Sequence, residues 1–317
     1  MTQSTKTKNM PLFSCTTNHH HHRRRHRHRH RIFTHSELAT ATSNFSSSSL
    51  LGRGSQSSVF LATFPSSPPF IAAAKLPSSF SELSILSSLP HSPFIVNLLG
   101  FTHPSPSIPL LELMPSGSLD HLLHNPSPPP WRRRLHLAFL SSLSLSFLHS
   151  LSPPIIHRDV KPSNILLDSS LNPRLSDFGL AVTFPSLSPP AGTLGYLDPS
   201  YTSPHLLTTK TDVFSFGVVL LELITGRRAI DVDYSPPALS DWALSMVTQR
   251  RFDEMCDARM GPVVIEEFAA VACLAARCVS SSPEDRPEMA EVAACLRRVR
   301  SPPVKRWRKW VTWWGPV

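Results

Sequence analysis

The hydrophobic pattern of the chain changes at HNPSPPP, residues 124–130, and this change constrains the fold more than any other feature. Before it, four short apolar runs between turn residues predict strands of a small, mostly antiparallel layer, and residues 80–89 predict one helix. The strand runs are VFLATF, FIAAAK, VNLLGFTH and LLELM. After it, apolar residues recur at helical spacing in residues 131–151, 212–224 and 266–279. The sequence therefore predicts an α+β fold with a small β-rich lobe ahead of a larger helical lobe.

Charge is distributed unevenly along the chain. The net charge is +9, but residues 1–31 carry 8 Lys/Arg and residues 297–317 carry 7, with no acidic residue in either segment, so the part between them is acidic. Residues 1–31 end in HHHHRRRHRHRHR, which cannot bury a core, and we expect a disordered basic tail. Residues 298–317 form a second basic tail that carries four tryptophans.

The role of these tails is open at this point. The His/Arg tract is either a solvated charged tail, a metal-binding segment, a contact for an anionic membrane or a nuclear-import signal. The tryptophans could pack on the body of the protein or lie at a lipid surface. Nucleic-acid binding through the tails is not expected, because it would leave the acidic middle of the chain unexplained.

Membrane and redox signals favour a cytoplasmic protein. We find neither a secretory signal nor a run of eighteen uncharged apolar residues, and residue 2 is threonine, which excludes N-myristoylation. Five cysteines form no CxxC pair, as is typical of reduced thiols in the cytosol. A peripheral position at the plasma membrane is compatible with the basic tails.

The stretch IIHRDVKPSNILLD, residues 155–168, has the chemistry of phosphoryl transfer. Asp159 can accept the proton of an attacking hydroxyl group, Lys161 can neutralise a transferred phosphate, and Asn164 can hold a metal ion. Thirteen residues after Asn164, the triplet DFG supplies Asp177 as a second metal ligand.

A second set of charged residues lies in the β-rich part. Lys75 ends the run AAAK, and Glu82 lies in the helix predicted next. A buried lysine held by a glutamate can reach the α- and β-phosphates of a nucleotide. The two sets together predict a phosphate-handling site between the lobes.

Five motifs occur in one order: HRDVKPSN, DFGLA, GTLGYLDPSY, DVFSFGVVLLELITG and EDRPEM. In this order they resemble the eukaryotic protein kinases, and the wording is most similar to the plant receptor-like (Pelle/IRAK-type) branch and its receptor-like cytoplasmic kinases. The resemblance covers residues 32–297. It implies a bilobal protein-kinase-like fold with a pre-kinase segment at 32–49 and a kinase domain at 50–297, whose N-lobe spans about 50–113 and C-lobe about 114–297.

The resemblance also assigns a nucleotide site. It implies ATP as cosubstrate and Mg²⁺ or Mn²⁺ held by Asn164 and Asp177. The Glu112 carbonyl and the Met114 amide would bind the adenine edge, with Leu111 beside them at the gatekeeper place. The residues assigned to ATP are Gly52, Gly54, Val59, Ala73, Lys75, Glu82, Glu112 and Met114.

Regulation and substrate class follow from the same resemblance. Arg158 before the catalytic Asp159 implies an arginine that reads a phosphate on the activation segment, residues 177–200. The candidate sites there are Thr183, Ser186 and Ser188. Thr193, together with Lys161, implies serine or threonine as the acceptor. The implied partners are protein substrates and a membrane receptor kinase.

Three departures from the family pattern favour an alternative, a weakly active or inactive kinase-fold scaffold. Ser57 stands where the nucleotide loop has its third glycine, so we expect weaker or slower nucleotide handling. Only seven positions separate Lys75 from Glu82, so their pairing is expected to need outside help. Ser200 replaces the glutamate that pairs with Arg286, so Ser200→Glu is expected to stabilise the protein.

Overall fold

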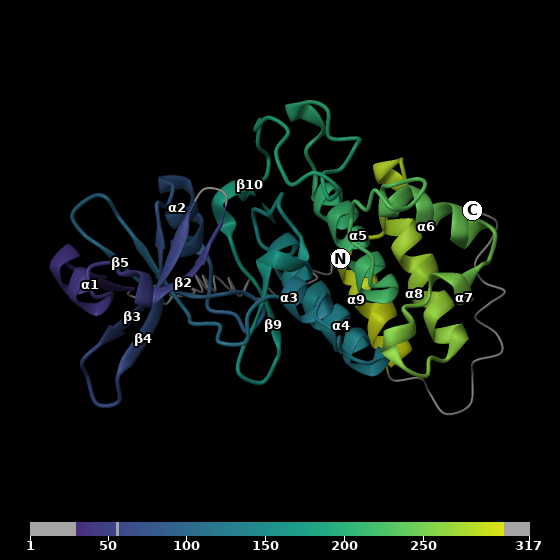
Figure 1. Ribbon diagram of the computed structural model, residues 1–317. Coiled ribbons are helices and arrows are strands. Elements are labelled where there is room, and N and C mark those ends of the chain that lie inside the picture. Colours follow the sequence, from purple (N-terminus) through teal and green to yellow (C-terminus); the bar gives the residue numbers. More distant parts are fainter. Residues whose placement is uncertain (1–29, 55–56, 301–317) are drawn as a thin grey trace, which may run out of the picture.

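The first lobe is built on one six-stranded sheet with the strand order β1-β5-β6-β4-β3-β2 (Figure 1). The computed structural model describes residues 30–54 and 57–300 of the chain. Neighbouring strands are antiparallel except for β1, which runs parallel to β5 with Arg31 opposite Gly100. The strands are β1 (Arg31–Phe33), β2 (Leu50–Arg53), β3 (Ser58–Phe64), β4 (Phe70–Leu76), β5 (Leu98–Thr102) and β6 (Pro109–Leu111). The four predicted strands are confirmed as β3, β4, β5 and β6, while β1 and β2 were not predicted.

The segment before β2 packs onto this sheet. It forms the helix α1 (His35–Ala41), which begins with a capping box in which Thr34 and Glu37 bond to each other's backbone amides. Phe33 and Leu38 are fully buried in a small core with Phe64, and the Phe33 and Phe64 rings lie 4.6 Å apart. Residues 31–41 are therefore part of the first lobe in space.

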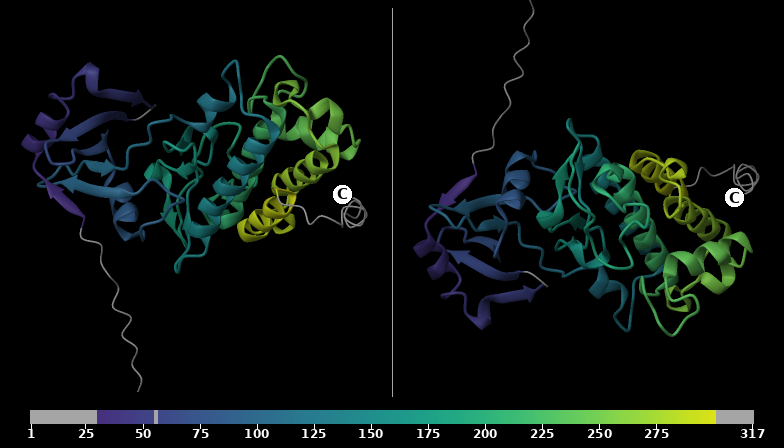
Figure 2. Two further views of the ribbon diagram at one scale, coloured as in Figure 1. Left: turned by 90° about the horizontal axis from the view of Figure 1, so that it is seen from below. Right: turned by 90° about the horizontal axis from the view of Figure 1, so that it is seen from above.

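The second lobe is mainly helical and lies at the other end of the molecule (Figures 1 and 2). Its predicted helices at 131–151, 212–224 and 266–279 are confirmed as α4, α5 and α8, while α3, α6, α7 and α9 were not predicted. The helices after α1 are α2 (Phe80–Ser88, first lobe), α3 (Leu119–Leu123), α4 (Trp131–His149), α5 (Thr209–Thr225), α6 (Leu239–Thr248), α7 (Phe252–Met255), α8 (Ile265–Cys278) and α9 (Met289–Arg300).

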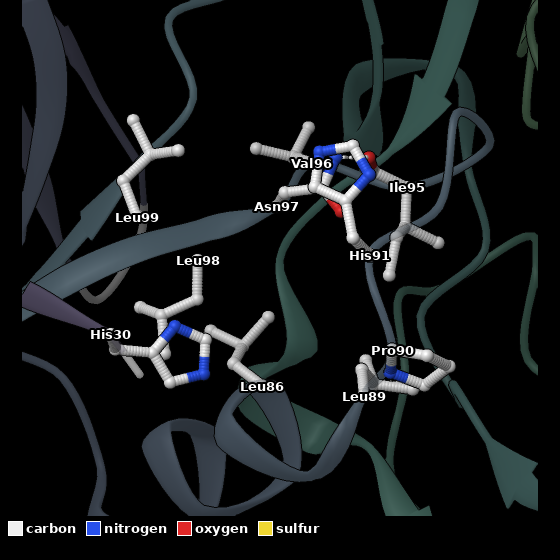
Figure 3. Close-up of a pocket in the computed structure, with 10 residues that line it drawn as sticks. All are labelled: His30, Leu86, Leu89, Pro90, His91, Ile95, Val96, Asn97, Leu98 and Leu99. Carbon is white, nitrogen blue, oxygen red and sulfur yellow. Dashed lines mark hydrogen bonds between the residues drawn. The ribbon is translucent and has the colours of Figure 1, made fainter. Parts of the chain in front are cut away.

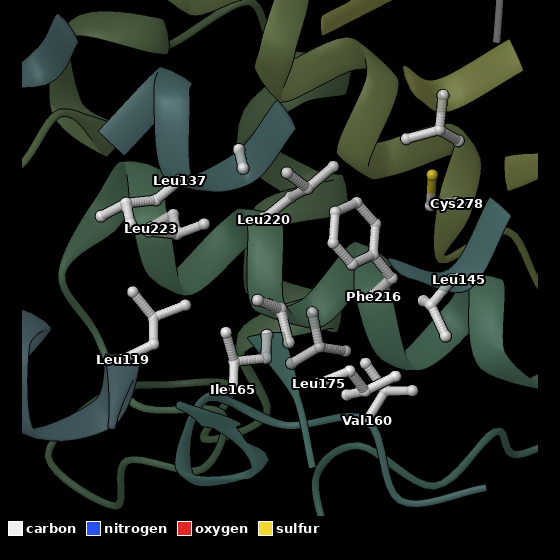
Figure 4. Packing of buried hydrophobic residues seen from close by; sticks show 14 of the residues in the cluster. Leu119, Leu137, Leu145, Val160, Ile165, Leu175, Phe216, Leu220, Leu223 and Cys278 are labelled. Atoms are coloured by element: carbon white, nitrogen blue, oxygen red, sulfur yellow. The ribbon is translucent and has the colours of Figure 1, made fainter. Parts of the chain in front are cut away.

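Helix α5 is the centre of the second lobe. Every side chain from Thr211 to Thr225 is buried, because α4, α6 and α8 all pack around the helix. Figure 4 shows Phe216, Leu220 and Leu223 of α5 among apolar residues that include Leu137 and Cys278. Because close packing surrounds α5, the helix keeps a fixed position, and the loops of the site are bonded to it.

Two short strand pairs lie between the sheet and the helices, and they carry the loops of the site. β7 (Ile155–Ile156) pairs with β10 (Val182–Thr183), and β8 (Ile165–Leu167) pairs with β9 (Pro173–Leu175), both antiparallel. Helix α9 continues to Arg300, three residues beyond the boundary predicted at 297. The inner ends of the two predicted basic tails are ordered, since Arg31 lies in β1 and residues 298–300 lie in α9, while residues 1–29 and 301–317 lie outside the described residues. None of the helices in the described part of the chain has both the length and the apolar character that a membrane crossing requires.

Candidate active site

The loop between β7 and β8 is anchored by a fully buried carboxylate, Asp212 in the first turn of α5. Asp212 accepts hydrogen bonds from the backbone amides of His157 and Arg158, both at 2.8 Å, and contacts His149 Nε2 at 2.9 Å. Burial alone would raise the pKa of Asp212, but His149 and the His157 amide outweigh it and hold the pKa below its usual value. These bonds support Arg158 in its left-handed conformation, with φ of 67°.

The three residues predicted to be catalytic lie together on this loop. Asn164 Nδ2 donates to Asp159 Oδ2 at 2.9 Å, and Lys161 Nζ lies 2.9 Å from the same oxygen. The Thr193 hydroxyl donates to Asp159 Oδ1 at 2.6 Å and accepts from Lys161 Nζ at 2.7 Å. A hydroxyl group from a different segment is thus already bound between the carboxylate and the ammonium group.

Asp177 and Lys75 meet between the lobes. Lys75 Nζ lies 2.6 Å from Asp177 Oδ1 and 2.6 Å from Glu82 Oε1. Burial acts to lower the pKa of Lys75, but the two carboxylates outweigh it, so the pKa is raised and the lysine is charged. Burial likewise would raise the pKa of Asp177, and Lys75 holds it below its usual value instead.

The loop with Asp159 and the loop with Asp177 are fastened to each other. The amide and the hydroxyl of Ser176 both donate to the Asn164 carbonyl at 2.8 Å. His157 Nε2 contacts the Ser176 carbonyl at 2.9 Å, and its ring meets the Phe178 ring edge-on, with centroids 5.1 Å apart. The residue before Asp177 is therefore bonded directly to Asn164.

The expectation that the Lys75–Glu82 pair needs outside help is wrong. Glu82 lies in the first turn of α2, and its amide donates to the side chain of the N-cap residue Ser79 at 3.0 Å. Ser78 Oγ donates to Glu82 Oε2 at 3.1 Å, so the second carboxylate oxygen is also held. The short linker places the glutamate at the very start of the helix, where these two serines fix it.

The residues assigned to the nucleotide lie on neighbouring strands of the first lobe's sheet. Gly52 is opposite Val59 between β2 and β3, and Val59 is opposite Lys75 between β3 and β4. The Gly54 amide donates to the Ser57 carbonyl at 2.7 Å, so the backbone of Ser57 closes the loop. Ala73 lies opposite Leu111. Leu111 is the last residue before the segment that joins the lobes, which begins at Glu112.

That joining segment is held by side chains. Glu112 Oε2 accepts from Arg174 at 2.9 Å and from Asn97 at 3.0 Å, and the Glu112 amide donates to the Asn97 carbonyl. Within the described residues, no hydrogen bond engages the Glu112 carbonyl or the Met114 amide. Both groups are therefore available to a ligand.

Arg158 does not contact the side chain of any predicted phosphorylation site in the described residues. Its guanidinium donates to the carbonyls of Leu180 and Pro189 and to the Tyr201 hydroxyl. The hydroxyls of Ser186 and Ser188 lie 2.8 Å apart and bond to each other, and Thr183 is exposed on β10.

Arg286 has a carboxylate partner, which corrects the expectation for Ser200. Arg286 Nη1 lies 2.5 Å from Asp198 Oδ2 and Nη2 lies 2.9 Å from Asp198 Oδ1, a buried bidentate pair. Ser200 donates its amide and hydroxyl to Asp198 at 2.9 and 2.8 Å, while its own oxygen is 3.5 Å from Arg286. Sequence reasoning missed Asp198, although it stands only two residues before Ser200.

A second buried carboxyl group supports the segment that carries Thr193. Glu222 on α5 accepts from the Tyr196 hydroxyl at 2.9 Å and from the Ala229 amide at 2.6 Å. Burial raises the pKa of Glu222 from 4.5 to about 8. At neutral pH this carboxyl group is therefore mostly protonated.

A separate pocket of about 190 Å³ lies between the end of α2 and β5 (Figure 3). Its lining is mostly apolar, with His30 and His91 on it, and includes Asn97, which binds Glu112. None of the residues predicted for catalysis lines this pocket.

Comparison with known proteins agrees with this geometry. The model of the protein kinase domain matches residues 45–295. A serine/threonine-protein kinase-like protein of Arabidopsis thaliana is 41% identical over 87% of this chain and 82% of its own length. Receptor-like cytoplasmic kinase 176 of Oryza sativa subsp. japonica is 36% identical over 84% and 76%, and the probable serine/threonine-protein kinase PBL7 of A. thaliana is 38% identical over 85% and 77%. The α+β fold and the placement of the predicted residues thus have one explanation: the chain belongs to the protein kinase family.

Proposed function

We propose that the chain is a serine/threonine protein kinase that transfers the γ-phosphate of ATP to protein hydroxyl groups. The observation that carries the proposal is the arrangement of Asp159 and Lys161 around the hydroxyl group of Thr193. In this arrangement the carboxylate accepts from an aliphatic alcohol while an ammonium group lies beside it, which supports the proposal. A serine or threonine of a substrate would present the same chemical group.

Asp159 has the capacity to accept one more hydrogen bond. Its Oδ2 contacts Asn164 and Lys161, and its Oδ1 accepts from Thr193. A carboxylate has about four acceptor positions, so one position of Oδ1 remains for the substrate hydroxyl. Asp159 orients that hydroxyl and takes its proton, while Lys161 stabilises the charge of the transferred group.

The nucleotide would lie between Lys75 and the segment that joins the lobes. Lys75, fixed by Glu82, would bind phosphate oxygens, and the Glu112 carbonyl and Met114 amide would bind the base. Asn164 donates through its nitrogen to Asp159, which leaves its amide oxygen for a metal ion next to the Asp177 carboxylate. We propose Mg²⁺, with Mn²⁺ as the alternative, because it binds oxygen ligands and neutralises phosphate charge.

The setting of this activity is proposed from the relatives. Their names include receptor-like cytoplasmic kinases of plants, so we propose protein substrates in a plant signalling chain and a membrane receptor kinase upstream. Cytoplasmic location with contact to an anionic membrane surface through the basic tails fits the eight positive charges of residues 1–31. Thr183, Ser186 and Ser188 are proposed as sites that become phosphorylated.

The test is phosphate incorporation by Asp159→Asn. The variant should lose transfer while binding ATP nearly as well as the wild type, because Asp159 acts on the acceptor hydroxyl. Asp241→Asn makes the same chemical change at an exposed position on α6 and should leave transfer intact. Equal phosphate incorporation by wild type and Asp159→Asn would refute the enzyme hypothesis and favour the kinase-fold scaffold.

A further inference from the structure

Tyr201, the residue after the activation segment, places its hydroxyl group among groups that belong to that segment and to the catalytic loop. The hydroxyl donates to the carbonyls of Ser188 at 2.7 Å and Pro189 at 2.9 Å. It also accepts from Arg158 Nη1 at 3.3 Å. Tyr201 is 2% exposed, so these bonds form away from water.

Arg158 binds the backbone of the activation segment directly. Its Nε donates to the Leu180 carbonyl at 2.7 Å, and its Nη1 donates to the Pro189 carbonyl at 3.0 Å. Leu180 stands near the start of the activation segment and Pro189 near its middle, so one guanidinium ties both places to the catalytic loop. Close to them, a Cβ atom on Gly192 would meet the Arg158 carbonyl at 2.9 Å, so the backbones also pack directly.

We propose that Tyr201 is a positioning residue whose hydroxyl, through Arg158, holds the activation segment in order without phosphate on Thr183, Ser186 or Ser188. The inference rests on the proposed function and deepens it. The Nε and Nη1 donors of Arg158 are already bound to two carbonyls and to Tyr201. A phosphate can engage these donors only by displacing buried hydrogen bonds, so it gains little from them.

Other contacts also hold the activation segment at both ends. Its first part pairs with the catalytic loop through β10 and β7, and the Phe184 amide donates to the Pro154 carbonyl at 2.8 Å. Its last part is fixed where Thr193 binds Asp159 and Lys161. The stretch around Ser188 and Pro189 lies between these two parts, and Tyr201 and Arg158 hold it there.

The experiment compares three full-length proteins with the wild type. Tyr201→Phe keeps the ring, which packs against Ile156 and Leu207, and removes only the hydroxyl. Tyr234→Phe makes the same change at a half-exposed tyrosine that stacks on Arg227, away from the segment. The third protein carries Thr183→Ala, Ser186→Ala and Ser188→Ala together, and phosphatase-treated wild type is measured beside it.

Two readouts are used: amide hydrogen exchange of residues 180–200 without nucleotide, and KM and kcat for ATP and for a protein substrate. Tyr201→Phe should exchange about tenfold faster in this segment and lose about tenfold in kcat/KM for the protein substrate, the effect of one or two lost hydrogen bonds. KM for ATP should not change, because Lys75 and Asp177 are untouched. Tyr234→Phe, the triple variant and the dephosphorylated protein should stay within about twofold of wild type, as ordinary surface changes do.

The proposal is overturned if the triple variant or the dephosphorylated protein loses protection of the segment. It is also overturned if Tyr201→Phe behaves like Tyr234→Phe in hydrogen exchange. A wild type that transfers no phosphate would refute the proposed function alone, since hydrogen exchange still decides whether Tyr201 orders the segment.

Discussion

Replacing Asp198 with asparagine would keep the size of this buried side chain and remove its charge. Arg286 is 1% exposed and Asp198 2% exposed, and the two share two short charge-assisted hydrogen bonds. Arg286 also donates to the carbonyls of Ser280 and Lys210, and these neutral bonds would remain. The variant thus leaves a guanidinium buried without a counter-charge.

The expected cost is at the lower end of the range for breaking a buried ion pair. Removing one partner of such a pair costs about 3–5 kcal/mol. Asparagine can still accept one hydrogen bond from Arg286, so we expect a loss of about 3 kcal/mol in the free energy of unfolding. Ser200→Ala removes one hydroxyl bond to Asp198 and should cost about 1 kcal/mol. Ser200→Glu should not stabilise, because it brings a second carboxylate beside Asp198.

Equilibrium unfolding in urea measures these differences, provided the slope with denaturant stays constant across the variants. Glu254→Gln is the matched control, because it removes one charge of the exposed pair Arg251–Glu254 and should leave stability almost unchanged. The double variant Asp198→Asn/Arg286→Met should lose less than the sum of the two single changes. Two results would refute the reasoning: Asp198→Asn costing no more than the control, or Ser200→Glu stabilising the protein only when Arg286 is present.

Three further changes test other parts of the structure. Burial raises the pKa of Glu222 from 4.5 to about 8, so wild-type stability should fall as pH rises across that window, by on the order of 5 kcal/mol. Glu222→Gln removes this titration and should flatten the urea-derived free energy of unfolding against pH; parallel curves for the two proteins would contradict this. Ser57→Gly should lower KM for ATP by freeing the tip of the nucleotide loop, and an unchanged or higher KM would show that serine suits it. Deleting residues 1–31, which lie mostly outside the described residues, should weaken sedimentation with anionic vesicles, most at low salt; equal binding would exclude a membrane role.

Much of the fold could be predicted because its elements are periodic and long enough to be distinct. Helices α4, α5 and α8 and strands β3 and β4 each carry their own hydrophobic pattern. Strand β1 could not be predicted, because its three residues have no pattern and their partner is β5, far along the chain. Helices α6, α7 and α9 have mixed or short patterns that flanking charges interrupt.

The residues proposed for catalysis could be found in the sequence because each motif is local. Asp159, Lys161 and Asn164 lie within six residues, and Asp177 follows in its own motif. Their supports could not be predicted, since Asp212 reaches the catalytic loop from α5 and Tyr201 reaches Arg158 from beyond the activation segment. Such contacts depend on tertiary packing. An acid at the start of the apolar run of α5 was the one available signal for Asp212.

The two structural departures that favoured a scaffold share one kind of compensation. At Glu82 the shortened linker is offset by Ser78 and Ser79, and at Arg286 the missing glutamate is offset by Asp198. In both places a residue within four positions of the altered site fills the role. At Ser57 the described residues offer no such compensation, and we expect this serine to affect nucleotide binding rather than the groups proposed to transfer phosphate. The scaffold hypothesis therefore depends on the nucleotide loop alone, and a measured affinity for ATP weighs more against it than any property of the catalytic loop.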